Sequence, residues 1–182
     1  MAISLAVQKK PMSHISGIIV HQTGGATAQS AFNSYKAGGS GAHFLIDKDG
    51  TIYQTASLNY QTWHVGKLQA RCLVNMACAP IELEALKKFN PTSEHRREIA
   101  KKVPNRYPAN QDSIGIELVG EALPKTVPEE KRVYETVTKE QNASLKWLID
   151  QLRFNFKIPL TEVFRHPVVS RKNPTEAATA RW

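Results

Sequence analysis

Two histidines, each at the end of a short apolar run, are the residues of this chain whose type and spacing could do chemistry. His21 ends the run 18–20, and His166 ends the run 163–165. β-Branched and aromatic residues dominate both runs, so each predicts a buried strand. Neutral imidazole is the commonest protein ligand for zinc, and a catalytic zinc needs three protein ligands and an open position for water. The pair indicates a Zn²⁺ site assembled by folding, although a histidine at a strand end can also be structural.

A carboxylate stands inside a third apolar run. Glu117 lies within residues 113–120, where its side chain must face either solvent or a cleft. Desolvation in a cleft would raise the pKa of this carboxyl and suit it to act as a general base. We therefore predict that Glu117 is catalytic, with a solvent-facing strand residue as the alternative.

Two further segments could contact a ligand. Trp63 and His64 supply an aromatic plate and a hydrogen-bonding ring that suit a sugar or peptide group, or else anchor a neighbouring insertion. Gln22 opens a segment of small side chains after His21, which leaves room for a ligand, and we expect it to bind substrate. For His43 we expect a packing role or a hydrogen bond to another residue rather than metal binding.

Periodicity predicts the elements that must position these residues. An Asp-Gly turn between 43–46 and 51–54 predicts a hairpin, and apolar spacing predicts a long helix over 139–156. Further predictions are helices over 27–37, 80–89 and 93–102, strands over 113–120 and 161–169, and a helix start at 173–176. Interleaved strands and helices favour one α/β domain over 1–182, with a central mixed β-sheet flanked by helices and an inserted helical and loop segment over about 67–110.

Composition bounds the class of protein. The chain has 182 residues, 41% apolar and 22% charged, which is typical of a globular protein. No apolar stretch approaches the roughly 18 residues that cross a bilayer, so we expect no membrane insertion. In the first ten residues the basic side chains follow the apolar part, so we expect no secretory signal and synthesis in the cytoplasm.

The net charge and the cysteines leave alternatives open. A formal charge of +8 would suit an anionic partner, but basic and acidic residues are interspersed, which favours solvated helix faces over a nucleic-acid surface. We expect no nucleic-acid partner. Cys72 and Cys78 could form a short-loop disulfide in an oxidising compartment or remain two thiols in a reducing one.

Taken in order, several motifs carry a family resemblance. They are His21-Gln22-Thr23, the segment 41–51, Trp63-His64-Val65-Gly66, the run 113–120 and the region from His166 to Trp182. Together they resemble the zinc N-acetylmuramoyl-L-alanine amidases, a family that includes phage lysozymes of the amidase type, the amidase of muropeptide recycling and animal peptidoglycan-recognition proteins. The resemblance covers nearly the whole chain outside 67–110. It implies a central mixed sheet, a zinc ion held by two histidines and a third ligand, and hydrolysis of the amide between N-acetylmuramic acid and L-alanine of peptidoglycan.

The resemblance also assigns residues. His21 and His166 match the two histidine ligands, and Glu117 matches the catalytic glutamate of the recycling branch. The phage branch uses a tyrosine before the hairpin histidine, but this chain has Ala42 there.

The third ligand departs from the family pattern. Asn173 stands where the family places aspartate or cysteine, and a neutral amide is a poor zinc ligand. We predict that Glu176 replaces it, with a capping-box role toward Asn173 as the alternative. We expect Lys172 to stabilise the oxyanion, with Arg171 as the alternative.

The same resemblance leaves two functions and several settings open. Without a charged third ligand, the domain could be a non-catalytic module that binds peptidoglycan or muropeptides. The inserted segment and the tail 170–177 look similar to bacterial amidases associated with type VI secretion, which suggests an antibacterial effector acting in a neighbour's periplasm and an immunity protein as partner. A phage endolysin and a recycling enzyme are the other settings.

Overall fold

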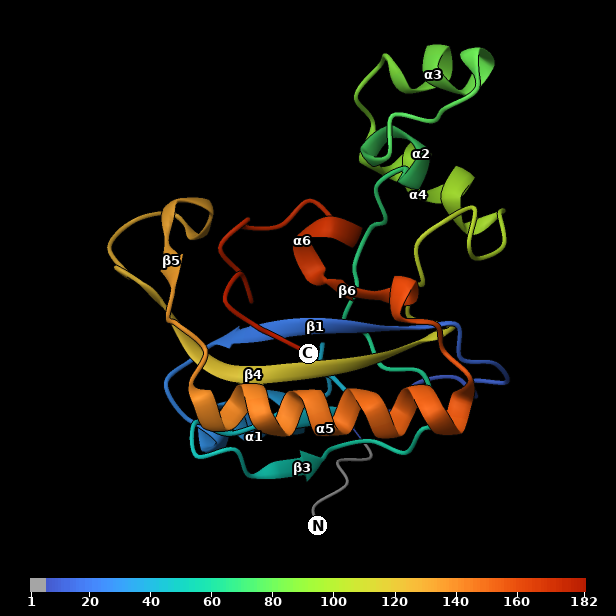
Figure 1. The fold of residues 1–182 in the computed structure, drawn as a ribbon. Coiled ribbons are helices and arrows are strands. Elements are labelled where there is room, and N and C mark those ends of the chain that lie inside the picture. The colour runs from blue at the N-terminus through green and yellow to red at the C-terminus, as the bar shows by residue number, and fades with distance from the viewer. Residues whose placement is uncertain (1–5) are drawn as a thin grey trace.

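A computed structural model describes residues 6–182, and a mixed sheet forms its centre (Figure 1). The strands are β1 (Gly17–Gly24), β2 (Phe44–Ile46), β3 (Ile52–Gln54), β4 (Ser113–Leu123), β5 (Val133–Tyr134) and β6 (Val163–Arg165). The order is β3-β2-β4-β1-β6, and β5 pairs with β4 outside this path. Strands β2, β4, β1 and β6 are parallel neighbours, whereas β3 and β5 are antiparallel to theirs. The predicted α/β fold with a central mixed sheet is confirmed.

Helices lie around this sheet. They are α1 (Ala28–Lys36), α2 (Arg71–Val74), α3 (Pro80–Leu86), α4 (Pro91–Ile99), α5 (Lys139–Phe156) and α6 (His166–Val169), with 3₁₀ turns at Glu129–Lys131 and Leu160–Glu162. The predicted helix over 139–156 is confirmed at both ends. Thr138 and Gln141 form a capping box that fixes its start. No helix in the described part of the chain has the length and apolar character needed to cross a membrane.

Helix α5 covers one face of the sheet (Figure 1). Alternate strand residues point toward it, and its own apolar stripe meets them in the largest core cluster. That cluster includes Ile18, Val20, Phe44, Ile46, Ile114, Ile116, Leu118, Leu145, Leu148, Ile149 and Leu152. Because this face is filled by aliphatic side chains, any polar site on the strands must lie on the opposite face.

The opposite face carries α1 and the segment after Trp63. Tyr35 of α1 packs in one cluster with Leu45 and Val119, while Ile19 packs with Val65 in another. These two clusters leave the strand positions between them uncovered by aliphatic side chains. His21 and Glu117 occupy those positions, since they alternate with residues of the α5 face.

The middle of the segment 67–110, with α2, α3 and α4, extends away from the sheet (Figure 1), whereas its ends pack against Ile19 of β1. A Cys72–Cys78 disulfide closes its first loop. Glu94 of α4 attaches the segment to the C-terminal region, because its carboxylate accepts two hydrogen bonds from Arg171 at 2.6 and 2.9 Å. Helices α3 and α4 replace the predicted ranges 80–89 and 93–102 with shorter or earlier bounds.

The predicted ends of two strands were also wrong. His21 does not end its strand, because Gln22 and Gly24 continue the pairing of β1 with β4. The predicted strand 161–169 ends at Arg165, and His166 begins α6 because Pro167 favours a helical first turn.

The predicted helix start at 173–176 was wrong as well. Residues 174–179 form turns instead. The Asn173 side-chain oxygen accepts from the backbone N–H of Thr175, and Ala177 has a left-handed φ of 53°. A local Asx turn of this kind competes with helix formation.

A buried ion pair supports the loop that leads into β4. The guanidinium of Arg106, 4% exposed, donates to both carboxylate oxygens of Asp112, 8% exposed, at 3.2 and 2.6 Å. Asp112→Ala leaves a buried cation unpaired, so we expect it to lower the free energy of unfolding by about 3–5 kcal/mol in urea denaturation at neutral pH. Asp150→Ala, which breaks exposed ion pairs with Lys146 and Arg153, is the control and should change the free energy of unfolding by less than about 1 kcal/mol. Equal costs would contradict this account.

Candidate metal centre

Parallel pairing places the first two site residues side by side. His21 of β1 stands directly opposite Glu117 of β4 in the register, and Leu45 of β2 stands opposite Glu117 on its other side. Residues opposite one another in neighbouring strands project to the same face of the sheet. The strand register alone therefore brings an imidazole and a carboxyl group into one site.

His166 is the first residue of α6 and directly follows the end of β6. Its Nε2 lies 2.9 Å from the backbone oxygen of Val65. A carbonyl oxygen only accepts hydrogen bonds, so Nε2 carries the proton. In the neutral ring this leaves a lone pair on Nδ1, which lies 3.0 Å from Glu176 Oε1.

Glu176 reaches the same point from the C-terminal turn. Its Oε1 lies 3.5 Å from Nδ1 of His21, whose Nε2 is engaged by His64 at 2.9 Å. The next residue, Ala177, takes the left-handed backbone conformation, and its N–H donates to the Gln22 side chain at 3.2 Å. The turn and the Gln22 contact together hold the Glu176 carboxylate toward the two rings.

These three side chains fit a zinc ion. One ligand atom from each of His21, His166 and Glu176 lies within 4.8 Å of the others, and all three residues are buried. Burial lowers the pKa of His21 to about 4, so its ring is neutral. Burial alone would raise the pKa of Glu176, but the imidazoles of His166 and His21 beside it outweigh burial and lower this pKa to about 2. An ionised carboxylate thus faces imidazole nitrogens in a donor set that zinc takes in catalytic sites.

A cavity of about 500 Å³ opens over this centre. Its lining residues are His21, Gln22, Thr23, Ser40, Trp63, His64, Gly66, Asn110, Glu117, Glu129, Tyr134, His166, Lys172 and Glu176. Trp63 is 53% exposed at this cavity, and the ammonium of Lys9 lies 4.6 Å from the centre of its ring. The cavity combines an aromatic plate, a cation from Lys172 and the two carboxylates that sequence analysis selected.

Glu117 has a hydrogen-bonded partner that sequence analysis missed. The Tyr35 hydroxyl donates to Glu117 Oε2 at 2.8 Å, from the first helix of the fold. Burial raises the pKa of Glu117 to about 7, although the Tyr35 hydrogen bond acts in the opposite direction. A carboxyl group with this pKa can both accept and return a proton near neutral pH.

The raised pKa of Glu117 makes the stability of the metal-free protein depend on pH. The native state holds this proton up to about pH 7, whereas the unfolded state releases it near the ordinary value of 4.5, so stability is lost as pH rises between the two. Glu117→Gln removes that loss. Relative to wild type, we expect its free energy of unfolding to gain up to about 3 kcal/mol between pH 4 and pH 8, in urea denaturation with a chelator present. A difference that stays constant with pH would contradict the buried, proton-holding Glu117.

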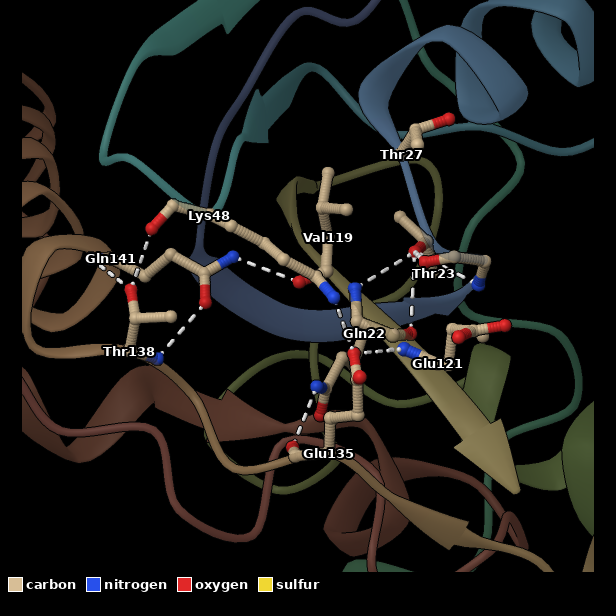
Figure 2. Close-up of polar contacts among 12 residues, drawn as sticks. Gln22, Thr23, Thr27, Lys48, Val119, Glu121, Glu135, Thr138 and Gln141 are labelled. Atoms are coloured by element: carbon tan, nitrogen blue, oxygen red, sulfur yellow. Dashed lines mark hydrogen bonds and ion pairs between the residues drawn. The ribbon is translucent and has the colours of Figure 1, made fainter. Parts of the chain in front are cut away.

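Other predicted residues have different surroundings. Gln22 lines the cavity, but its amide also donates to the Glu135 backbone oxygen at 2.8 Å and accepts from Ala177. Figure 2 shows this part of the network, in which Gln22 and Glu135 join β1 to the segment around β5. His43 is buried beneath the site, where its Nδ1 accepts from the Gly115 N–H and its Nε2 donates to the Tyr60 oxygen.

The tail residues divide between the site and its supports. Asn173 donates to the backbone oxygens of Glu129 and Arg132, so its amide ties two loops together outside the histidine and carboxylate cluster. The guanidinium of Arg171 is engaged by Glu94, whereas Lys172 lines the cavity. The geometry therefore favours Lys172 over Arg171 as the cation that faces the substrate. It favours Glu176 over Asn173 as the candidate third metal ligand.

Asn110 and Tyr134 also line the cavity and were missed. Asn110 follows two prolines in the inserted segment, and Tyr134 lies in a two-residue strand, so no periodic pattern marks either residue.

Solved structures of other proteins have a similar fold. A mutant endolysin from Bacillus subtilis is 21% identical with a TM-score of 0.52, and the match covers 91% of this chain and 80% of that chain. AMPDH3 from Pseudomonas aeruginosa is 16% identical with a TM-score of 0.56, over 93% of this chain and 58% of that chain. AmiD from E. coli, in complex with anhydro-N-acetylmuramic acid-L-Ala-D-gamma-Glu-L-Lys, is 16% identical with a TM-score of 0.53, over 87% and 50%. These likenesses show a shared fold.

The family of this chain is shown by a family model rather than by an individual relative. A search of curated proteins found no match. The family model of N-acetylmuramoyl-L-alanine amidase matches residues 10–177, which is nearly the whole chain. This chain therefore belongs to the N-acetylmuramoyl-L-alanine amidase family.

Proposed function

We propose that this protein is a zinc-dependent amidase that hydrolyses the bond between N-acetylmuramic acid and L-alanine in peptidoglycan. One observation carries the proposal. His21, His166 and the ionised Glu176 converge within 4.8 Å, and a carboxyl group with its pKa raised to about 7 lies beside them on the next strand. Family membership and the muropeptide bound to AmiD support the choice of bond and substrate.

His21, His166 and Glu176 would hold the metal. When bound, zinc would supply Lewis acidity that polarises the substrate carbonyl and lowers the pKa of water. Glu117 lies beside His21 and accepts the proton of the attacking water through the oxygen that Tyr35 does not occupy. It then returns that proton to the departing amine of L-alanine, because its pKa near 7 suits both directions.

The remaining cavity residues would bind and orient the substrate. Lys172 brings a cation to the cavity, where it can donate a hydrogen bond to the oxygen that gains negative charge. Trp63 offers an exposed ring on which a sugar or a peptide unit can stack. Because Gln22 already bonds to Glu135 and Ala177, its contribution to substrate binding would come through its position in the wall.

The charged third ligand supports an enzyme over a binding module. Glu176 would supply the negative charge that a neutral Asn173 could not, which supports a metal site over a metal-free module. Elemental analysis of the purified protein should find one zinc per chain, and a chelator should remove both the metal and the hydrolysis. Full activity after complete removal of zinc would contradict the proposal.

For the biological setting we propose an antibacterial effector that acts on the cell wall of a target bacterium. The Cys72–Cys78 disulfide supports action in an oxidising compartment such as the periplasm. An immunity protein in the producing cell is the partner that such an effector requires. Co-expression with the genetic neighbour of this gene should protect cells in which the protein is directed to the periplasm, and toxicity that no neighbour relieves would contradict this setting.

A further inference from the structure

Behind the ligand His21 lies a second buried imidazole. His64 packs edge to face against His21, with the ring centres 5.1 Å apart. The ring fits against β4 because Gly115 has no side chain there: a Cβ at this position would lie 2.8 Å from His64 Cγ. The sequence suggested substrate binding for His64, but its two ring nitrogens are both occupied by protein groups.

The hydrogen-bond partners of His64 decide which of its ring nitrogens carries the proton. The Ser113 hydroxyl donates its only hydrogen to the backbone oxygen of Ala109 at 2.6 Å. The same oxygen, 3.2 Å from His64 Nε2, must therefore accept a hydrogen bond from that nitrogen. A neutral imidazole carries one N–H, so His64 Nδ1 accepts and His21 Nε2 donates across their 2.9 Å separation. His21 is left with a lone pair on Nδ1, the nitrogen that faces Glu176.

The next residue along the chain acts on the other histidine. The backbone oxygen of Val65 accepts from His166 Nε2 at 2.9 Å. Asn110 holds this dipeptide in place, because its side-chain oxygen accepts from the backbone N–H groups of both His64 and Val65 at 3.0 and 2.8 Å. One short segment thus contacts the outer nitrogen of both histidines.

We propose that the His64–Val65 dipeptide is a clamp that fixes the proton of each ligand histidine on Nε2, and that His64 is a positioning residue for zinc rather than a substrate-binding residue. The role of His64 in positioning a zinc ligand rests on the proposed function. The tautomer of His21 does not need the metal. Groups that hold the second nitrogen of a ligand histidine commonly raise metal affinity by fixing ring orientation and tautomer.

The experiment measures zinc affinity and tautomer separately. Zinc affinity is measured by competition with a chromophoric chelator, on variants shown by circular dichroism to be folded. His64→Ala should weaken it about 10–100-fold. His64→Asn, whose side-chain oxygen can replace the accepting Nδ1, should recover most of that loss. His95→Ala is the control, because His95 accepts from the Leu68 N–H and contacts neither ligand histidine, and it should leave zinc affinity unchanged.

The tautomer is read in the metal-free protein from the ¹⁵N shifts of the imidazole rings. Wild type should show His21 protonated on Nε2, and His64→Ala should show a mixture. The proposal is overturned if His21 carries its proton on Nδ1 in wild type, if folded His64→Ala binds zinc as tightly as wild type, or if His64→Asn is as weak as His64→Ala. Failure of wild type to bind zinc would instead sink the proposed function, and the ring shifts would still decide the tautomer.

Discussion

Glu117→Gln is expected to lower the rate of amide hydrolysis about 10²–10⁴-fold, the contribution typical of a general acid and base. The substitution keeps the shape of the side chain and an oxygen that can accept from Tyr35. It removes the group that takes the proton from water and returns it to the amine. Turnover is measured with a soluble muropeptide under saturating substrate, and zinc content and unfolding are measured on the same preparation.

The matched control for this prediction is Glu121→Gln. Glu121 lies on the same strand, β4, but not among the residues that line the cavity. It should retain wild-type turnover. If Glu117→Gln kept activity within a few-fold of wild type while still binding zinc, the assignment of the proton-transferring group would be wrong.

Glu176→Gln is expected to remove stoichiometric zinc and, with it, turnover. The carboxylate lies 3.0 Å from Nδ1 of His166 and 3.5 Å from Nδ1 of His21, and its loss leaves the two imidazoles with no negative charge beside them. We therefore expect zinc affinity to fall by more than the roughly 10–100-fold that loss of an outer hydrogen-bond partner costs. Elemental analysis after dialysis against a weak chelator provides the measurement.

Asn173→Ala separates the two candidates for the third ligand. Its amide holds the Glu129 and Arg132 backbone oxygens, so we expect this variant to unfold more easily but to keep its zinc. The opposite pattern, with zinc retained by Glu176→Gln and lost from folded Asn173→Ala, would contradict this assignment. It would show that Asn173, which stands where the family places its third ligand, binds the metal instead.

The sequence was sufficient where local pattern decides structure. The helix over 139–156 has an apolar stripe and a Thr138 cap, and both ends were predicted. The Asp-Gly turn was sufficient for the hairpin of β2 and β3, because Gly50 takes a φ of 87° and its N–H bonds back to Asp47. Strand β4 was also predicted, with the position of Glu117 inside it.

What the sequence could not supply was register and turn geometry. That His21 faces Glu117 depends on the alignment of β1 with β4, which are almost 100 positions apart in the chain. Glu176 was selected from its charge, but its approach depends on the left-handed Ala177 and on Gln22, which no sequence pattern marks. His64 was selected as a ring suited to substrate, since nothing local shows that Ser113 and His21 occupy its two nitrogens.

Mass spectrometry of purified peptidoglycan digested by the zinc-loaded protein tests the central claim most directly. The account predicts released stem peptides that begin with a free L-alanine amino group, and glycan strands whose N-acetylmuramic acid keeps its lactyl carboxyl group. Products cut within the stem peptide or within the glycan strand, or an undigested wall in the presence of bound zinc, would contradict it.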